Sequence, residues 1–167
     1  RDYDNLICCE IICHGVASAQ LFHDYVDYLS KRLKGTIIDI SFRDKKKGWG
    51  SLLKITYKKG DKTHVKYLSK EESSYYYYYY MENAAYRDAC YECAFADSKR
   101  NSDITVGDFW GGRRLMPYVD SDLGMSAIIV STGKGQSLFN ECSELFEYIE
   151  TDFGTMSKEN PNLVHPT

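Results

Sequence analysis

The stretch RDACYECAFADSKRNSDITVGDFWGG, residues 87–112, combines a cysteine pair with a predicted strand and a glycine-rich turn. Cys90 and Cys93 form a Cys-x-x-Cys motif, and residues 102–109 hold the β-branched and apolar side chains of a short strand. A Cys-x-x-Cys pair is either a complete redox dithiol or one half of a metal or cluster site. If it is half of a site, the rest of the chain has to supply the other half.

Length and composition indicate a single domain, residues 1–167. With 167 residues, of which 43% are hydrophobic, the chain is long enough for one well-filled core. Its net charge of -3 argues against bulk binding of nucleic acid. No apolar run approaches the roughly 20 residues of a membrane span, and the start lacks a signal-peptide pattern, so we expect a cytoplasmic protein. Because the chain begins with arginine, we expect it to be part of a longer protein.

The first part of the chain predicts a strand, a helix, a second strand and a hairpin. Residues 5–13 are a nearly unbroken apolar run, as in a buried strand. From Ser18, a suitable N-cap, apolar residues recur at helical spacing as far as Leu33, and a glycine follows. Residues 36–44 alternate as a strand does, and residues 51–68 form two alternating runs around a Gly-Asp turn.

The second part predicts two strands and two helices. Residues 69–85 have a polar start suited to a helix N-terminus and contain six consecutive tyrosines. Residues 102–109 and 125–132 read as strands, and residues 133–150 as an amphipathic helix. The whole predicts an α/β or α+β fold, a mixed β-sheet flanked by helices in a single domain.

The pattern also predicts the arrangement of side chains in two segments. In the second strand the apolar positions alternate against polar ones, and in the tyrosine-rich helix one side of the run is expected to be buried. In the strand, Ile38, Ile40 and Phe42 alternate against Asp39, Ser41 and Arg43. In the helix, the residues expected to face the core are Tyr75, Tyr78 and Tyr79.

Cys13 lies in the segment CHGVAS, where the first strand ends and the helix is about to begin. Backbone N–H groups near a helix start stabilise a thiolate, and the neighbouring Gly15 gives a bulky ligand room to approach the backbone. A buried structural cysteine is the alternative for this position. His14 is either a ligand or base, or a simple hydrogen-bond partner in the turn.

The spacing of Cys90 and Cys93 brings two sulfurs to one metal ion or cluster. A thioredoxin-like dithiol would stand at the start of a helix after the first strand of a βαβ unit, and this pair does not. Zinc and an iron–sulfur cluster both remain open. Six cysteines could form three disulfides, but disulfide scaffolds are usually smaller and richer in cysteine, so reduced thiols fit better. Cys13 is the strongest candidate for a third ligand, ahead of the cysteines inside apolar periodic segments, which are Cys8, Cys9 and Cys142.

The segment FRDKKKGWG, residues 42–50, is strongly basic and holds a tryptophan. It is either a solvated charged loop or a site for an anionic cofactor, in which Arg43, Lys45, Lys46 and Lys47 hold phosphates beside an indole ring.

The segment DITVGDFWGG, residues 103–112, offers hydrogen-bonding side chains next to glycines that permit close backbone approach. Asp103, Thr105 and Asp108 are the polar residues, and Gly107 and Gly111 are among the glycines. The pattern is neither a GxGxxG dinucleotide motif nor a phosphate-binding Walker loop.

Four segments, in this order, resemble the C-terminal domain of the coenzyme F420 hydrogenase/dehydrogenase beta-subunit family: CHGVAS, FRDKKKGW, CYECAFADSKRNSDITVGDFWG and GMSAIIVSTGKG. The resemblance covers nearly the whole chain. It implies a flavoprotein with iron–sulfur clusters that passes electrons between a 4Fe-4S cluster, FAD and a soluble acceptor such as coenzyme F420. It also implies redox partners, either other redox subunits or a ferredoxin, and a small-molecule electron acceptor.

The resemblance assigns roles to the candidate residues. Cys13, Cys90 and Cys93 look like three ligands of the 4Fe-4S cluster, and relatives have a fourth in a TPCQ-like turn upstream of this chain. The basic residues would hold the FAD pyrophosphate or an acidic substrate, and they are Arg43, Lys45 and Lys47. The residues that would line the flavin are Asp103, Thr105, Gly107, Asp108, Trp110 and Gly111.

Two other functions are compatible with the sequence. A zinc-stabilised interaction domain without turnover would use the same three cysteines as a structural site. An accessory role in polysaccharide biosynthesis is a setting in which bacterial relatives occur.

Overall fold

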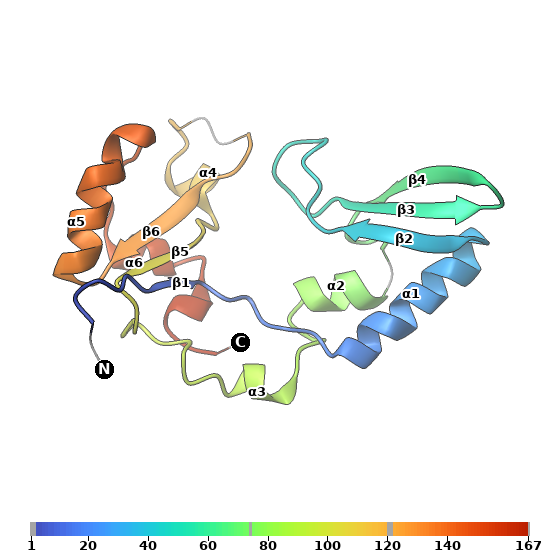
Figure 1. Cartoon of the computed structure of the whole chain (residues 1–167), viewed down its shortest axis with the longest axis horizontal. Helices are drawn as coiled ribbons and strands as arrows, with labels where there is room; N and C mark the ends of the chain where they lie inside the picture. The colour runs from blue at the N-terminus through green and yellow to red at the C-terminus, as the bar shows by residue number, and fades with distance from the viewer. Residues whose placement is uncertain (1–2, 74, 120–121, 167) are drawn as a thin grey trace. The chain divides into compact units, whose positions relative to one another are not determined.

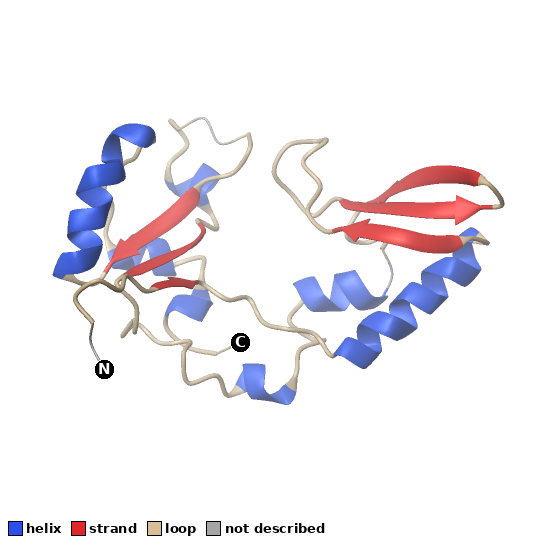
Figure 2. Cartoon of the chain, in the orientation of Figure 1, coloured by secondary structure: helices blue, strands red, loops and turns tan. Residues whose placement is uncertain are grey.

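The computed structural model describes residues 3–73, 75–119 and 122–166, and it divides the chain into two compact units. Unit 1 is formed by Arg1–His14 and Glu92–Thr167, and unit 2 by Gly15–Tyr91. Each unit contains one three-stranded sheet with helices beside it (Figures 1 and 2).

The sheet of unit 1 is mixed. Its strands are β1 (Cys9–Ile11), β5 (Ile104–Asp108) and β6 (Ser126–Val130), in the order β1-β5-β6. β1 pairs parallel with β5, and β5 pairs antiparallel with β6. The helical segments of this unit are α4 (Gly112–Leu115), α5 (Gly133–Cys142), η1 (Ser143–Leu145), α6 (Phe153–Ser157) and η2 (Pro161–Leu163).

One face of this sheet packs on a small apolar core. Ala127 of β6 is buried with Phe109 and Met116 from the turn after β5. Met156 and Leu163 from the last helical turns complete the cluster. The C-terminal segment therefore closes the core beneath the sheet.

The sheet of unit 2 is antiparallel and two helices pack against it. Its strands are β2 (Thr36–Ser41), β3 (Leu53–Lys59) and β4 (Lys62–Leu68), in that order. The helices of the unit are α1 (Ala19–Leu33), α2 (Tyr75–Met81) and α3 (Asp88–Tyr91). The buried core joins α1 and α2 to β3 and β4 through Tyr25, Leu29, Leu53, Ile55, Leu68, Tyr76 and Tyr77.

The predicted fold class is confirmed: the chain is an α/β structure with a mixed sheet and flanking helices. The strands are divided between two separate sheets, because β2, β3 and β4 pair only among themselves in the described part of the chain. The predicted strand over residues 5–13 is shorter in the structure, only Cys9–Ile11. Leu6 and Ile7 before it are 47% and 40% exposed, so the apolar run is not buried along its length.

The expected burial of the tyrosine run was wrong for two residues. Tyr78 and Tyr79 are 36% and 49% exposed, whereas Tyr76 and Tyr77 are buried. The ring of Tyr76 stacks on the ring of Tyr25 at a centroid distance of 5.0 Å, which fixes the rotation of α2 about its axis. The side chain of Tyr75 lies outside the described part of the structure.

A β-bulge overturns the expected alternation in β2. The pairing with β3 skips a residue between Ile37 and Asp39, so Ile37 and Ile40 both face the core. The skipped residue, Ile38, is 51% exposed. A bulge places two residues opposite one on the partner strand, and this shifts the side-chain alternation by one position. Phe42 is 39% exposed, yet its ring contacts that of Tyr77 at a centroid distance of 5.1 Å.

No helix in the described part of the chain is both long enough and apolar enough to cross a bilayer.

We expect the replacement Ile55→Ala to lower the free energy of unfolding by about 2–5 kcal/mol, because the side chain is fully buried and its loss leaves a cavity. Val65→Ala on the adjacent strand is the control, since Val65 is 50% exposed and should cost less than about 1 kcal/mol. Urea denaturation followed by circular dichroism measures both. Equal losses in the two variants would contradict the assigned core.

Candidate functional site

All six cysteines are free thiols in the structure. Cys13 is exposed, and Cys90 and Cys93 are half-buried. Cys13 and Cys93 belong to unit 1, and Cys90 belongs to unit 2. Within the described residues, no three His, Cys, Asp or Glu side chains are grouped so that they could hold a single metal ion.

The sulfur of Cys90 is held by a backbone N–H group from the CHGVAS segment. Val16 donates its N–H to Cys90 Sγ at 3.4 Å. A β-bridge between Ala17 and Tyr86 and a hydrogen bond from the N–H of Arg87 to the carbonyl of Val16, at 2.9 Å, fix this approach. N–H donors to cysteine sulfur are a recurrent feature around iron–sulfur centres, where they tune the reduction potential.

Gly15 is required for this arrangement. Its φ of +131° lies in a region that favours glycine, and a Cβ there would stand 2.8 Å from the ring of Tyr86. Tyr80 donates its hydroxyl to the carbonyl of Gly15 at 3.1 Å. The sequence predicts that Gly15 leaves room for a bulky ligand to approach the backbone, and in the structure the group that approaches it is the ring of Tyr86.

The parallel pairing of β1 and β5 brings two predicted segments to one edge of the sheet in unit 1. Both strands run in the same direction, so the segments after Ile11 and after Asp108 leave from the same edge. The rings of His14 and Trp110 meet there edge to face, with centroids 4.7 Å apart. The turn that holds Cys13 and the turn that holds Trp110 are therefore neighbours.

Asp103 is buried and ties three parts of unit 1 together. Its carboxylate accepts the N–H of Cys8 at 2.8 Å and the hydroxyl of Thr132 at 2.5 Å. These hydrogen bonds hold the pKa of Asp103 below its usual value, and the bond from the Cys8 N–H has a larger effect than the bond from the Thr132 hydroxyl. Thr132 is also the N-cap of α5 and accepts the N–H of Gly135. Asp103 thus links β1, the start of β5 and the start of α5.

Thr105 is fully buried and belongs to a polar group that spans β1 and β5. It donates its hydroxyl to Glu10 Oε1 at 2.9 Å, and Arg100 Nε donates to the same oxygen at 2.5 Å. The Arg100 side chain is only 5% exposed. Glu10 and Arg100 were not predicted, since nothing in the local pattern of either residue signals a partner about 90 positions away.

The two predicted glycines of this region have close neighbours. A Cβ at Gly107 would stand 2.8 Å from the side chain of Ile12, so the glycine allows β1 and β5 to pack closely. Gly111 has a φ of +73°, and a Cβ there would collide with the side chain of Glu159. Glu159 is paired with Arg114.

Asp108 and Trp110 flank the same turn. The backbone carbonyl of Asp108 accepts the side-chain amide of Asn160 at 3.4 Å. Asn160 is 3% exposed, and its side-chain oxygen is a buried acceptor with no partner among the described atoms. Asn160 was not predicted, because it lies in a loop-rich tail without a recognisable motif.

The basic loop lies in unit 2, between β2 and β3. The guanidinium of Arg43 stands 5.3 Å from the centre of the Trp49 ring, and Lys46 Nζ stands 4.3 Å from the centre of the Tyr67 ring. Lys45 and Lys47 are exposed. Two cations of the loop therefore lie against aromatic rings.

Comparison with known protein families decides the class of the protein. The family model for the C terminus of the coenzyme F420 hydrogenase/dehydrogenase beta subunit matches residues 2–152. The chain belongs to this family. The suspected resemblance is thus confirmed, and membership supports an oxidoreductase role as part of a redox enzyme with several subunits. No curated protein and no solved structure matches the chain.

We expect Asp103→Asn to make unfolding easier at neutral pH and to weaken its pH dependence. The lowered pKa means that folding favours the charged carboxylate. That contribution is fully present above about pH 4, the range of an unfolded aspartate, and is lost as the pH falls through the lower folded value. Thermal unfolding between pH 7 and pH 2 measures the effect.

The exposed Glu150, replaced by Gln, serves as the control for Asp103→Asn. Unchanged stability of Asp103→Asn at pH 7, combined with loss of flavin binding, would assign Asp103 a direct role at the cofactor and refute the structural one.

Proposed function

We propose that the chain is part of an iron–sulfur flavoprotein oxidoreductase that passes electrons between a 4Fe-4S cluster, FAD and a soluble organic acceptor in the cytoplasm. Coenzyme F420 is one acceptor that fits the family name. The observation that carries the proposal is the shared sheet edge at which the turn of Cys13 meets the turn of Trp110. In open α/β sheets, ligands bind outside the carboxyl ends of the strands, and both turns follow such ends.

The three proposed cluster ligands are Cys13, Cys90 and Cys93. Cys13 precedes Val16 by three residues, and Val16 donates to Cys90 Sγ. Cys93 follows Cys90 by three residues. Along the sequence, each outer cysteine is therefore three residues from a partner in the Val16–Cys90 hydrogen bond.

The chemistry of the donor set fits an iron–sulfur cluster. Three free thiols are available, and one of them already accepts an N–H hydrogen bond of the kind that surrounds cluster sulfurs. A 4Fe-4S cluster takes four cysteines, so the fourth ligand would come from the upstream TPCQ-like turn that the family resemblance implies. When bound, the cluster would supply one-electron transfer and the flavin would supply hydride chemistry.

The proposed flavin residues of unit 1 have two different tasks. Three of them hold β5 against β1. Asp103 accepts the N–H of Cys8 and Thr105 donates to Glu10, whereas Gly107 leaves room for the side chain of Ile12. Asp108, Trp110 and Gly111 form the turn at the carboxyl end of β5, where Trp110 offers an aromatic surface to an isoalloxazine ring.

The proposed phosphate residues lie in the basic loop of unit 2. Arg43, Lys45 and Lys47 would hold the FAD pyrophosphate or an acidic substrate through charge-assisted hydrogen bonds. Arg43 has a φ of +58°, a left-handed conformation that the cation–π contact with Trp49 helps to hold.

The first test is the cofactor content of the chain extended upstream through the TPCQ-like turn and purified without oxygen. We expect about four irons and one flavin per chain, as the proposed stoichiometry requires. Iron, acid-labile sulfide and flavin assays measure this. A colourless protein with one zinc per chain would refute the proposal and would favour the structural zinc site instead.

In the extended protein, we expect Cys13→Ser, Cys90→Ser and Cys93→Ser each to lose most of the iron, because each removes a thiolate ligand. Cys142→Ser is the matched control, since Cys142 lies at the end of α5 and is not a proposed ligand. Visible absorbance near the charge-transfer bands of the cluster provides the measurement. Iron loss in the control as great as in the three variants would count against the assignment.

Replacing Lys45 and Lys47 together by alanine should weaken FAD binding by at least about tenfold, because a hydrogen bond to a charged group contributes about 1.5–3 kcal/mol. The control pair is Lys62→Ala with Lys66→Ala, which removes the same charge from β4. Flavin fluorescence titration of the iron-loaded protein gives the affinity. Equal affinities in the two pairs would remove these lysines from the proposed site.

A further inference from the structure

The sheet of unit 2 has one face that its own helices leave open. α1 and α2 pack on the face that carries Leu53, Ile55 and Leu68 (Figure 2). Side chains alternate across a strand, so the residues between these positions point to the opposite face. No helix of the described part of unit 2 contributes a buried residue to that side.

The register of the strands defines the open face. Lys54 pairs with Tyr67, Thr56 with Val65, and Lys58 with Thr63, and directly paired residues share a face. Val65 is 50% exposed, and Lys58 and Thr63 are exposed as well. Lys54 and Lys58 are separated by four residues of strand, about 13 Å. The open face therefore carries two lysines, an aromatic ring and a valine on adjacent strands.

A third lysine joins this face from the basic loop. Lys46 Nζ stands 4.3 Å from the centre of the ring of Tyr67. Asp39, which pairs with Thr56, is the acidic residue on the paired positions of β2. Among the described residues, neither Lys54 nor Lys58 forms an ion pair. We call the surface formed by Lys46, Lys54, Lys58, Val65 and Tyr67 the basic sheet face.

The charge of the chain is unevenly divided between the units. Unit 2 has 14 Lys and Arg and nine Asp and Glu, a net charge of +5, whereas unit 1 has seven and 15, a net charge of -8. A positive surface of this kind attracts acidic partners at long range, even though the whole chain is acidic.

We infer that the basic sheet face docks an acidic electron-carrier protein. Three lysines supply complementary charge, and Val65 and Tyr67 supply the apolar contact that a protein interface needs at its centre. Nucleic acid is the less suitable occupant, because the face has lysines rather than the arginines that bind phosphate in pairs. The choice of an electron carrier rests on the proposed function, and the docking itself does not.

The test measures binding without turnover, so that it stays separate from the cofactor assays. The probe is a plant-type 2Fe-2S ferredoxin, a small acidic protein, immobilised for biolayer interferometry against the whole chain. We expect binding at about 50 mM salt that weakens at least about tenfold at about 300 mM, because screening shortens the reach of surface charges. Cytochrome c, a basic protein of similar size, is the charge control, and its binding should not be weakened by Lys54→Glu with Lys58→Glu.

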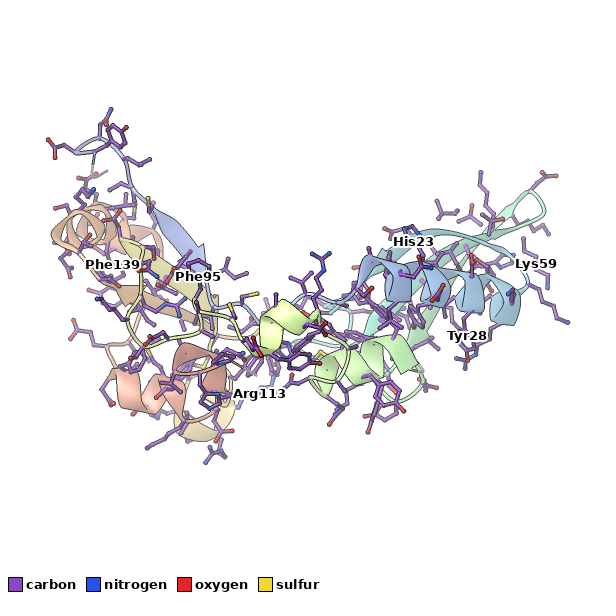
Figure 3. The ribbon with its side chains drawn as sticks, turned by 90° about the horizontal axis from the view of Figure 1, so that it is seen from below. His23, Tyr28, Lys59, Phe95, Arg113 and Phe139 are labelled. Atoms are coloured by element: carbon purple, nitrogen blue, oxygen red, sulfur yellow. The ribbon has the colours of Figure 1, made fainter. Side chains whose placement is uncertain are left out.

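Two charge-reversal pairs locate the binding surface. Lys54→Glu with Lys58→Glu should weaken binding at least about tenfold at low salt. Lys62→Glu with Lys66→Glu makes the same charge change on the opposite face of the same hairpin, because these residues pair with Lys59 and Ile55, and should change binding less than about threefold. Figure 3 labels Lys59 at the hairpin end and Tyr28 on α1.

Folding of each variant is checked by thermal unfolding, and Lys54→Gln with Lys58→Gln provides a milder change that should give an intermediate loss of affinity. An equal loss in both reversal pairs would show that only the net charge matters and would overturn the inference. The absence of ferredoxin binding, or tighter binding of a 20-base-pair DNA duplex than of ferredoxin, would overturn it as well. A protein that fails the cofactor assays and still binds ferredoxin through Lys54 and Lys58 would separate the docking from the proposed function.

Discussion

The hydrogen-bonded ion pair between Glu10 and Arg100 holds the parallel contact on which the candidate site depends. Glu10 lies on β1, which is only three residues long, and so short a strand has little pairing energy of its own. Arg100 and Thr105 both donate to one oxygen of Glu10, and the arginine is almost entirely withdrawn from water. Removing one partner of such a pair leaves a buried charge alone, which is strongly destabilising. The alignment of β1 with β5 is therefore fixed by a few polar contacts rather than by a long ladder.

Local patterns in the sequence were sufficient for most of the helices and strands. The helix after Ser18 and the hairpin around Gly60 follow from spacing and turn chemistry, and both are present. Spacing could not reveal the bulge beside Ile38, because a bulge is a property of the pairing between two strands. The rotation of the tyrosine-rich helix was likewise set from outside, by the rings of Phe22 and Tyr25 against Tyr76.

The candidate site was predictable to the extent that its residues form contiguous motifs. Cysteine spacing and the order of four segments pointed to the family, and the family match confirms this. Residues that act through distant partners carried no signal. Arg100, in the linker between the cysteine pair and the strand, reads as a solvated charge, and Asn160 lies in an irregular tail. The structure also gives Asp103 and Thr105 scaffolding contacts that a motif cannot show.

Gly15 controls whether a backbone N–H group can reach the sulfur of Cys90. Any larger residue at this position would push against the ring of Tyr86 and disturb the bridge that holds the N–H of Val16 on Cys90. Every ligand would still be present after such a change. In the proposed centre, the sulfur would lose an N–H hydrogen bond, which raises its electron density and lowers the reduction potential of the cluster. The residue at position 15 would then influence the reduction potential of the protein without contacting the metal.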